Sequence, residues 1–564
     1  LDGLSVFFLL LITGFGVFIY LYANSYLALD KNRPRFFVFL SLFMGAMVGL
    51  VMSGSLLLMF VFWELTSLSS YLLIGYYHDK EKSRNSALQA MLVTVMGGLF
   101  MLAGIILIGV EADTFRIDEL MSNPNLVIQS PKASIILILL SIGAFTKSAQ
   151  FPFHFWLPNA MEAPAPVSAY LHSTTMVKAG IFLLTRLSSI FSGLPLWHIL
   201  LPIVGGFTMI FGAVKAIMHT DLKKILAYTT VSALGIMVML LGIGTTAAVQ
   251  AAMVFVLAHA LYKGTLFMVV GNIEHQTSMR DVNQLSGLRK KMPYTFIAAA
   301  FAALSMAGVI PFFGFIAKEL LYTATAYSPT WNYLILASTF IASALFASLS
   351  IEIGYKLFFG NEVSSSNQIS EASIGMLFGP IVASSLGLLG GLFATQFVQQ
   401  LLHYASNVAL KTEAVLDLSL WHGFTIIFAL SLLTLLVGWG IYLIRHKIRA
   451  SANRYNLNNS FGPEAIYNQS ISGLLKISSI QTRFFQSGLL RNYLAAIALF
   501  FVAMVFVVIG FGDFDTSIVS LFQSSVGFLV HEVLIVLIMF IALWVLVNSK
   551  SFFQAEDGIR DANV

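Results

Sequence analysis

Ionisable side chains in the middle of apolar segments are the residues of this sequence whose types and positions best suit them for chemistry. Glu64 lies in FVFWELTSLSSYLLIG, Lys178 in HSTTMVKAGIFLLTR, and His259 and Lys263 in VLAHALYKG. Loss of water destabilises a buried ammonium, so such a lysine can release and regain a proton, and a nearby carboxylate would hold that proton. Histidine already exchanges protons near neutral pH. The sequence therefore predicts a buried proton path, whose candidate residues are Glu64, Lys147, His172, Lys178, Lys215, His219, His259, Lys263, Lys318 and Glu319.

The energetic cost of these charges favours a shared, hydrated interior. A charge at the centre of a membrane helix costs about 2.5–3.5 kcal/mol, and several of them would consume most of a typical folding stability of about 5–15 kcal/mol. His259 and Lys263 are four residues apart and so share one helical face. A structural ion pair explains any single member equally well. The occurrence of acid, lysine and histidine at similar depth on several helices favours the proton path.

Two prolines lie beside two of the candidate lysines. Phe151-Pro152 follows Lys147, and Ile310-Pro311 precedes Lys318. Non-helical backbone at membrane depth is tolerated only beside protein or a water-filled cavity, and paired interrupted helices are typical of internally repeated transporters. A simple proline kink is the alternative at each position. The sequence predicts helix breaks at Pro152 and Pro311.

The composition identifies the elements that must position these residues as membrane helices. Of 564 residues 58% are hydrophobic and 10% charged, with a mean hydropathy of +0.85, whereas soluble domains are about 25% charged. A span needs about 20 apolar residues. We expect an all-α polytopic membrane protein with roughly fifteen spans, near 4–24, 36–53, 54–76, 86–110, 133–153, 165–190, 197–218, 224–243, 248–272, 293–323, 332–358, 374–397, 423–444, 490–511 and 526–548.

The charges of the connections predict the orientation of the bundle. If the first span runs from outside to inside, eighteen basic residues fall in inner connections and three, Arg116, Lys132 and Lys411, in outer ones. Basic residues are retained on the cytoplasmic side of membrane proteins. The net charge of +5 therefore reflects topology rather than binding to nucleic acid. The long connection after residue 444 is expected to lie inside.

Several kinds of chemistry are not expected. The chain contains no cysteine, and its eleven histidines form no zinc-binding motif, so we predict no metal and no cofactor. We therefore expect a secondary ion transporter rather than an enzyme. The sequence starts at Leu1 in mid-pattern and is expected to be truncated, while residues 552–564 are expected to be a non-native tail.

Five segments of the sequence resemble the antiporter-like membrane subunits, a family shared by respiratory complex I and the multisubunit Mrp-type cation/proton antiporters. They are FWELTSLSSYLLIG, KSAQFPFHFWLPNAMEAPAPVSAYLHSTTMVKAG, DLKKILAYTTVS, AHALYKGTLFM and PFFGFIAKE. The resemblance covers residues 1–400 and is closest to the large, A-type subunits. The segment GPEAIYNQSISGLLKISSIQTRFFQSGLLRNY resembles their C-terminal extension. Complex I's large subunit instead carries a long lateral amphipathic helix, and 464–490 is only modestly amphipathic.

The resemblance implies a fold and a set of roles. It implies a helical bundle with two inverted five-helix repeats and two broken helices, whose first two helices are missing here. It implies domains at 1–400, the proton-translocating core, and 401–551, a membrane extension. Glu64 matches an essential glutamate, paired with Lys147. The remaining matches are a bridging histidine at His172, a central axis of Lys178, His259 and Lys263, and an exit-side lysine at Lys318 beside Glu319.

Three functions remain open at this point. The first is antiport of protons against Na⁺ or another monovalent cation, within a complex of several membrane subunits in a bacterial inner membrane. The second is a proton-pumping subunit of a redox-driven complex, and the third is a structural subunit that moves no ions. Carboxylates in the missing C-terminal region are implied to serve the second ion, so the present chain is informative about the proton alone.

Overall fold

The structure is a computed structural model that describes residues 1–329, 331–361, 369–411, 413–454, 462–486, 490–511, 540, 541 and 544. The chain divides into two compact units, Leu1–Pro463 and Glu464–Val564. Across the described residues the regular structure is helical apart from two isolated β-bridges. The prediction of an all-α protein is confirmed.

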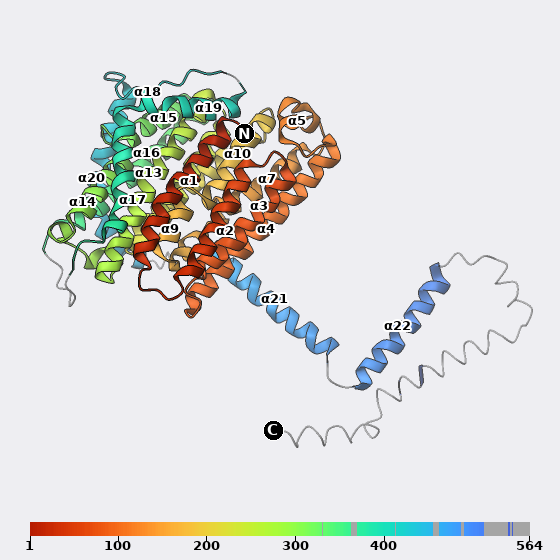
Figure 1. Ribbon diagram of the computed structural model, residues 1–564. Coiled ribbons are helices and arrows are strands. Elements are labelled where there is room, and N and C mark those ends of the chain that lie inside the picture. The colour runs from red at the N-terminus through yellow and green to blue at the C-terminus, as the bar shows by residue number, and fades with distance from the viewer. Residues whose placement is uncertain are drawn as a thin grey trace, which may run out of the picture. The chain divides into compact units, whose positions relative to one another are not determined.

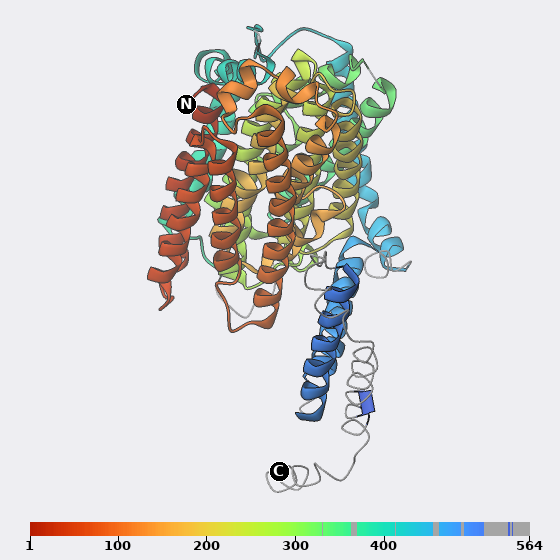
Figure 2. The same ribbon diagram turned by 90° about the vertical axis from the view of Figure 1, so that its right-hand side faces the viewer.

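The first unit holds most of the helices, and Figures 1 and 2 show them running side by side as a bundle. The α-helices of the chain are α1 (Gly3–Tyr26), α2 (Arg33–Met52), α3 (Leu56–Ile74), α4 (Glu81–Ala112), α5 (Ile117–Ser122), α6 (Asn125–Ile128), α7 (Ala133–Lys147), α8 (Trp156–Asn159), α9 (Ala165–Ser173), α10 (Met176–Phe191), α11 (Trp197–Met218), α12 (Leu222–Ile243), α13 (Thr246–Thr277), α14 (Pro293–Ala307), α15 (Phe313–Ala326), α16 (Asn332–Ile351), α17 (Ile374–Leu392), α18 (Ala394–Phe397), α19 (Gln399–Leu410), α20 (Ile426–Arg454), α21 (Pro463–Phe485) and α22 (Leu490–Phe511). Short 3₁₀ turns are η1 (Phe153–Phe155), η2 (Ala160–Glu162), η3 (Val282–Gln284) and η4 (Leu288–Lys290), and η5 (Glu352–Lys356) is a π-helical turn that continues α16.

The centre of the first unit is formed by α10, α12 and α13. Every residue of α10 is buried, and more than nine-tenths of the most apolar stretches of α12 and α13 is buried as well. Ten of the described helices are long and apolar enough to cross a membrane, and the two halves of each interrupted span are shorter. The chain is therefore a multi-pass membrane protein with its most enclosed helices at the middle of the bundle.

Local sequence signals explain where the central helices begin and end. The Asp221 carboxylate and the Thr245 hydroxyl accept backbone N–H groups at the starts of α12 and α13, which satisfies donors that have no partner within the helix. Gly244 and Gly308 end α12 and α14 in the left-handed region, where glycine has no Cβ to clash.

Both spans with a proline beside a lysine are interrupted in the structure. Helix α7 ends at Lys147, and apart from the four-residue helix α8 the α-helix resumes only at Ala165. Helix α14 ends at Ala307 and α15 begins at Phe313. The Phe151-Pro152 and Ile310-Pro311 bonds inside these two breaks are cis.

A third interruption corrects the expectation of one continuous span over 165–190. The chain leaves the helix between α9 and α10, where Thr175 has φ −118° and ψ −107°. The Thr175 hydroxyl donates to the Tyr170 carbonyl at 2.7 Å, so a side chain supplies a hydrogen bond in place of the helical ladder. No proline is present in this break, and for that reason the sequence pattern did not reveal it.

The end of α20 corrects a second expectation. The connection predicted after residue 444 is still helix, because α20 continues to Arg454. Arg445 and Arg449 are buried there rather than exposed in a loop. Buried ion pairs with Glu352 hold this added length against the bundle.

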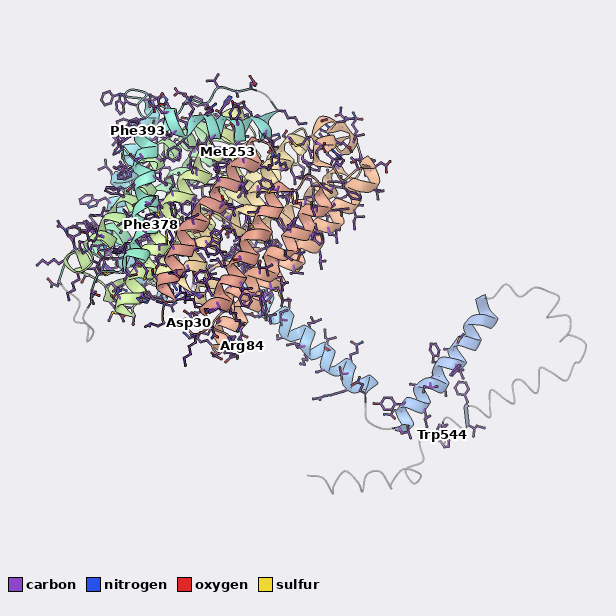
Figure 3. The ribbon with its side chains drawn as sticks, in the orientation of Figure 1. Asp30, Arg84, Met253, Phe378, Phe393 and Trp544 are labelled. Carbon is purple, nitrogen blue, oxygen red and sulfur yellow. The ribbon has the colours of Figure 1, made fainter. Side chains whose placement is uncertain are left out.

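The ends of the bundle agree with the predicted orientation. Asp30 and Arg84, from two connections predicted to lie inside, are at the same end of the first unit, and Phe393 is at the opposite end (Figure 3). Arg84 donates to the His78 carbonyl at this end.

The predicted domain boundary at residue 400 falls inside the first unit. Helix α19 packs against α1, α10 and α13, and α20 packs against α11, α15 and α16. The functional division between 1–400 and 401–551 stays a prediction.

The modestly amphipathic segment becomes the exposed helix α21 of the second unit. The predicted span 526–548 and the tail 552–564 lie outside the described residues, except for 540, 541 and 544.

Candidate functional site

The centre of the candidate site is a group of fully buried basic side chains on α9, α10 and α13. The Lys178 ammonium donates to the Val256 carbonyl at 2.8 Å, which joins α10 to α13. The Lys263 ammonium donates to the Thr229 hydroxyl, which joins α13 to α12. His259 lies within electrostatic range of Lys178 and Lys263. The structure thus gathers residues that are far apart in sequence around one helix.

The two histidines of this group have unused hydrogen-bonding capacity. Both ring nitrogens of His172 and both of His259 are buried without a hydrogen-bond partner within the described part of the chain. His172 packs beside Phe267, with the ring centroids 4.9 Å apart, and lies within electrostatic range of Lys263. Since buried polar groups normally have partners, these nitrogens identify the polar centre of the bundle.

Lys147 is held by the same helix that carries Glu64. Its ammonium donates to the Trp63 carbonyl at 3.1 Å, the Thr66 hydroxyl at 2.6 Å and the Ser67 hydroxyl at 2.8 Å, and these three acceptors match its three donors. No ion pair within 4 Å joins Lys147 to Glu64 in the described residues; the two interact electrostatically. The implied pairing is therefore one of neighbouring charges on α3 and α7, not of direct contact.

Two glycines on α4, which the sequence analysis missed, make room for side chains of α3 and α7. A Cβ at Gly98 would lie 1.8 Å from Glu64 Oε1, and a Cβ at Gly97 would lie 1.8 Å from the Thr146 hydroxyl oxygen. Gly98 thus makes room for the carboxylate of α3, and Gly97 for the end of α7. The adjacent Gly-Gly pair in the middle of an apolar span was the available sequence signal.

Helices α7 and α10 touch at residues next to their lysines. The Ser148 hydroxyl donates to the Val177 carbonyl at 2.7 Å, and these residues are the immediate neighbours of Lys147 and Lys178. A Cβ at Gly180 would lie 2.3 Å from the Ala144 carbonyl oxygen, so α10 approaches α7 as closely as a glycine permits. This contact connects the Glu64 side of the site to the central group.

Lys318 lies on the far side of α13, at the second broken helix. Its ammonium donates to the Ala307 carbonyl at 3.1 Å, at the C-terminal end of α14, where a helix favours positive charge. A cavity of about 20 Å³ beside it is also lined by Tyr262 and Ser305. That volume can hold one water molecule. Tyr262 packs edge-on against His259 at 5.5 Å, so the cavity lies between Lys318 and the central group.

The carboxylate of Glu319 lies beside the segment that precedes α20 and interacts electrostatically with Lys318. Its Oε1 atom is buried and has no hydrogen-bond partner among the residues that the structure places. Its Oε2 atom is 3.9 Å from Nδ1 of His422. His422 was not among the predicted site residues, because it lies outside every apolar span.

Lys215 and His219 do not join the central group. They lie at the end of α11 that the predicted orientation puts inside, where Lys215 is 6.0 Å from the Phe211 ring and His219 stacks on Tyr228 at 4.9 Å. His154 is within electrostatic range of Lys215 and is buried with Nδ1 unpaired in the described structure. His154 stands in the quoted FPFHFW motif, but it was not selected as a candidate.

Another cluster of buried charge at this end has a structural role. Nη1 and Nη2 of Arg449 each donate to Glu352 at 2.7 Å, and Nε of Arg445 donates to the same carboxylate at 3.3 Å. Nε of Arg449 donates to the Ile217 carbonyl at 3.0 Å. All the oxygens of Glu352 are therefore paired, and the cluster fixes α20 to α11 and α16.

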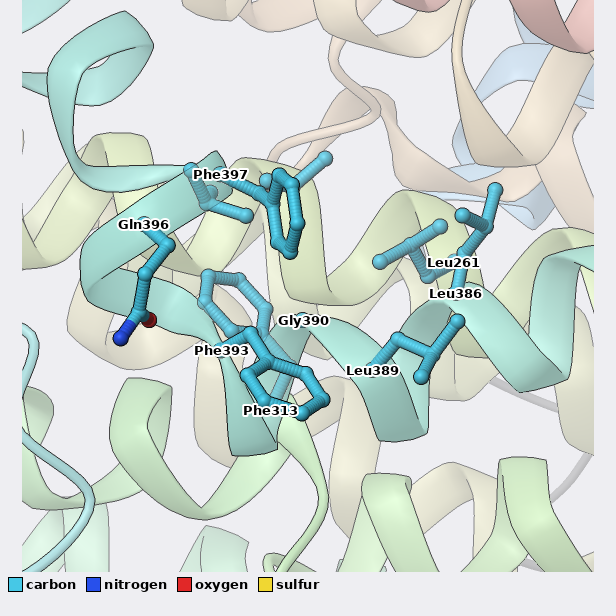
Figure 4. A pocket seen from close by; sticks show the side chains of 10 residues that line it. Leu261, Phe313, Leu386, Leu389, Gly390, Phe393, Gln396 and Phe397 are labelled. Carbon is cyan, nitrogen blue, oxygen red and sulfur yellow. The ribbon is translucent and has the colours of Figure 1, made fainter.

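A spacious pocket near the site is apolar. It measures about 790 Å³ and lies between α13, α15, α17 and α18 (Figure 4). Its lining residues are Leu257, Leu261, Phe313, Leu386, Leu389, Gly390, Phe393, Gln396, Phe397 and Val398. It offers no ionisable group, so it is a poor place for ions. In the described residues no cluster of His, Asp and Glu could hold a metal ion.

Comparison with known proteins relates this arrangement to a family. Residues 53–346 match the family described as "NADH:quinone oxidoreductase/Mrp antiporter, TM", and residues 1–37 match "NADH-Ubiquinone oxidoreductase (complex I), chain 5 N-terminus". The chain is 38% identical over 535 residues to the A-type subunit of the Na(+)/H(+) antiporter of Alkalihalophilus pseudofirmus, covering 89% of this chain and 66% of that protein. It is 37% identical over 570 residues to the corresponding Na(+)/H(+) antiporter subunit of Bacillus subtilis, covering 95% and 70%.

A solved structure shares the fold. The chain matches a chain of the Mrp complex from Dietzia sp. DQ12-45-1b with a TM-score of 0.81 and 32% identity, covering 90% of this chain and 55% of that one. The present chain thus spans about two thirds of the curated relatives named above and about half of the solved chain.

Proposed function

The chain belongs to the family of Na(+)/H(+) antiporter A-type subunits, and from that premise we propose that it moves protons across a membrane in exchange for a monovalent cation, along its buried Glu, Lys and His side chains. The observation that carries the proposal is the gathering of Lys178, Lys263, His172 and His259, all fully buried, around the central helix α13. Charged side chains facing lipid would be costly, so these residues must face polar groups or water inside the bundle.

The first half of the proposed path runs from α3 to α10. Glu64 and Lys147 form a neighbouring acid and base, and the ammonium releases its proton when the charge on Glu64 changes. The Ser148–Val177 contact holds α7 against α10, which carries Lys178, the next proton acceptor of the proposed path. His154, Lys215 and His219 extend this half toward the inner surface.

The second half runs from α13 to α15. His259 receives the proton between Lys178 and Lys263, and an imidazole can take it on one nitrogen and release it from the other. Tyr262 and the small cavity lead on to Lys318. The transfers from Lys147 to Lys178, from Lys178 to His259 and onward to Lys318 join residues on different helices, so slight movements of the broken helices can open and close the path.

The cation, the partners and the location belong to the same proposal. Relatives are named Na(+)/H(+) antiporter subunits, which favours Na⁺ as the exchanged ion and other membrane subunits as partners, in a bacterial inner membrane. The same names favour antiport over a redox-driven pump, although the family is shared with complex I. A gene neighbourhood with small membrane subunits would support antiport, and one with quinone- and NADH-handling subunits would contradict it.

The decisive test replaces Glu64 in the complete antiporter complex. In everted vesicles from an antiporter-deficient host, Glu64→Gln is expected to lower Na⁺-induced proton movement by about 100-fold or more, the range for a positioned proton-transfer group. Glu81→Gln, at an exposed carboxylate on α4, is the matched control and should retain full exchange. Normal exchange by an assembled Glu64→Gln complex would refute the proposal.

A further inference from the structure

A histidine outside the membrane spans stands between a carboxylate of α15 and a carboxylate of its own segment. His422 lies in the segment 413–425, between α19 and α20. Its Nδ1 is 3.9 Å from Glu319 Oε2, and its Nε2 is 3.4 Å from Asp417 Oδ2. The two ring nitrogens therefore face different carboxylates, one toward the bundle and one toward solvent.

The exposure of these side chains rises steadily along the series. Lys318 is 6% exposed, the side chain of Glu319 is 12% exposed, that of His422 is 42% exposed and that of Asp417 is 61% exposed. The series thus leads from the second broken helix to the surface of the first unit. The charged groups that face His422 are Glu319 from α15 and Asp417 from its own segment, with Lys318 behind Glu319.

An aromatic cluster holds the histidine segment against α15. The rings of Trp421 and Phe424 pack on Phe428 at 4.9 and 5.9 Å, and Phe428 packs on Phe315 at 6.4 Å. Phe315 lies four residues before Glu319 and so on the same face of α15. His422 is therefore held beside Glu319 by packing on both sides of it in sequence.

Asp417 is prepared to orient the imidazole rather than to compete for its proton. Its Oδ1 accepts from the Ser419 hydroxyl at 2.5 Å and from the Ser419 N–H at 2.9 Å, which leaves Oδ2 facing His422. The Ser419 hydroxyl holds the pKa of Asp417 below its usual range, so this carboxylate remains ionised at neutral pH.

We propose that His422 is a proton-transfer residue that connects Glu319, and through it Lys318, to the outer aqueous phase. In the inward direction, Nε2 takes a proton from solvent while Nδ1 gives its proton to Glu319. The starting tautomer returns when Nε2 releases a proton to water and Nδ1 takes one from water, an exchange that the partly exposed ring permits. No electron or other atom moves. A small shift of the ring, or one water, closes the 3.9 Å gap. The inference rests on the proposed function and adds the outer end of its path.

The test measures proton transfer in proteoliposomes that contain the complete antiporter complex. With a dilute, membrane-impermeant morpholinesulfonate buffer on the His422 side, His422→Ala is expected to slow exchange by roughly tenfold, below the full range for a positioned proton-transfer group because water also reaches Glu319. Concentrated buffer on that side should restore most of the rate, and the same buffer on the opposite side should not. His422→Gln should behave like His422→Ala, which guards against a failure of one variant to assemble.

The control is His403→Ala, which removes an imidazole on α19 that is paired with Asn407 and faces no carboxylate of the path. It should exchange at the wild-type rate. A His422→Ala complex that keeps the wild-type rate in dilute buffer would overturn the inference, as would a slow rate that concentrated buffer on the His422 side leaves unchanged. If Glu64→Gln abolishes exchange in the same vesicles, the proposed function survives either of these results.

Discussion

Each of the two helices interrupted beside a proline has its own lysine near the break, and the two lysines are held in different ways. Lys147 ends the first half of its span and reaches across to α3, where three acceptors satisfy it completely. Lys318 lies on the second half of its span and binds back to the carbonyl end of the first half. One ammonium depends on a neighbouring helix, and the other depends on the break itself.

The difference teaches which lysine has access to water. Lys147 is fully buried among protein acceptors, so its proton can leave only when its surroundings change. Lys318 adjoins a cavity large enough for one water and a carboxylate that leads to the surface. We infer that Lys147 controls the path and that Lys318 exchanges protons with the outside.

The largest expected effect tests whether Lys147 releases its proton at all. Lys147→Arg keeps a positive charge, but a guanidinium does not lose its proton in a protein. Exchange in vesicles should therefore fall about 100-fold or more if Lys147 acts as an acid and base. Lys132→Arg, at an outer lysine paired with Glu111, should have no effect. Full activity in assembled Lys147→Arg would reduce Lys147 to a fixed charge and erase the distinction from Lys318.

A smaller effect is expected when the cradle of Lys147 is weakened. The double substitution Thr66→Val and Ser67→Ala removes two acceptors of the ammonium, each hydrogen bond to a charged group being worth about 1.5–3 kcal/mol. Exchange should drop roughly tenfold, and the pH at which it is half-maximal should move down because the charged lysine is less stable.

The matched control for the cradle is Ser69→Ala on the same helix, whose hydroxyl donates to Leu65 of its own helix. It should leave both the rate and the pH profile unchanged. An unshifted pH profile in the double variant would show that the charge of Lys147 is set elsewhere.

The smallest expected effect concerns the break that holds Lys318. Gly308 has φ +69°, and a Cβ there would lie 2.7 Å from Lys318 Cε. Gly308→Ala should cost about 1–2 kcal/mol in backbone strain and slow exchange about fivefold. Gly387→Ala, at a helical glycine with open space around it, should be neutral. Equal rates in the two variants would mean that Lys318 tolerates displacement, contrary to the geometry of the break.

Sequence reasoning succeeded where the signal was local. Runs of apolar residues predicted the spans, and Pro152 and Pro311 stand inside breaks that the structure contains. It failed where a tertiary contact replaced a local rule. The break at Thr175 has no proline, and the helix through Arg449 continues into a predicted loop because Glu352 of another helix pairs with it.

The candidate site was predicted in part for the same reason. Burial of a charge in an apolar run is visible in the sequence, and it selected Lys178 and Lys263. The role of Gly98 became visible only when α4 was placed against Glu64. His422 could not be selected, because a histidine in a polar connection has no distinguishing pattern until the fold brings Glu319 to it.

The sequence by itself determined that this chain spans a bilayer and that several of its membrane helices contain ionisable residues. The length of an apolar run and the cost of a buried charge are local properties that a sequence displays. Only the tertiary structure decided which charges meet. Hydrogen bonds and Coulomb attraction act over a few ångströms, and residues as distant in sequence as Lys178 and Val256 come within that range only when α10 packs against α13.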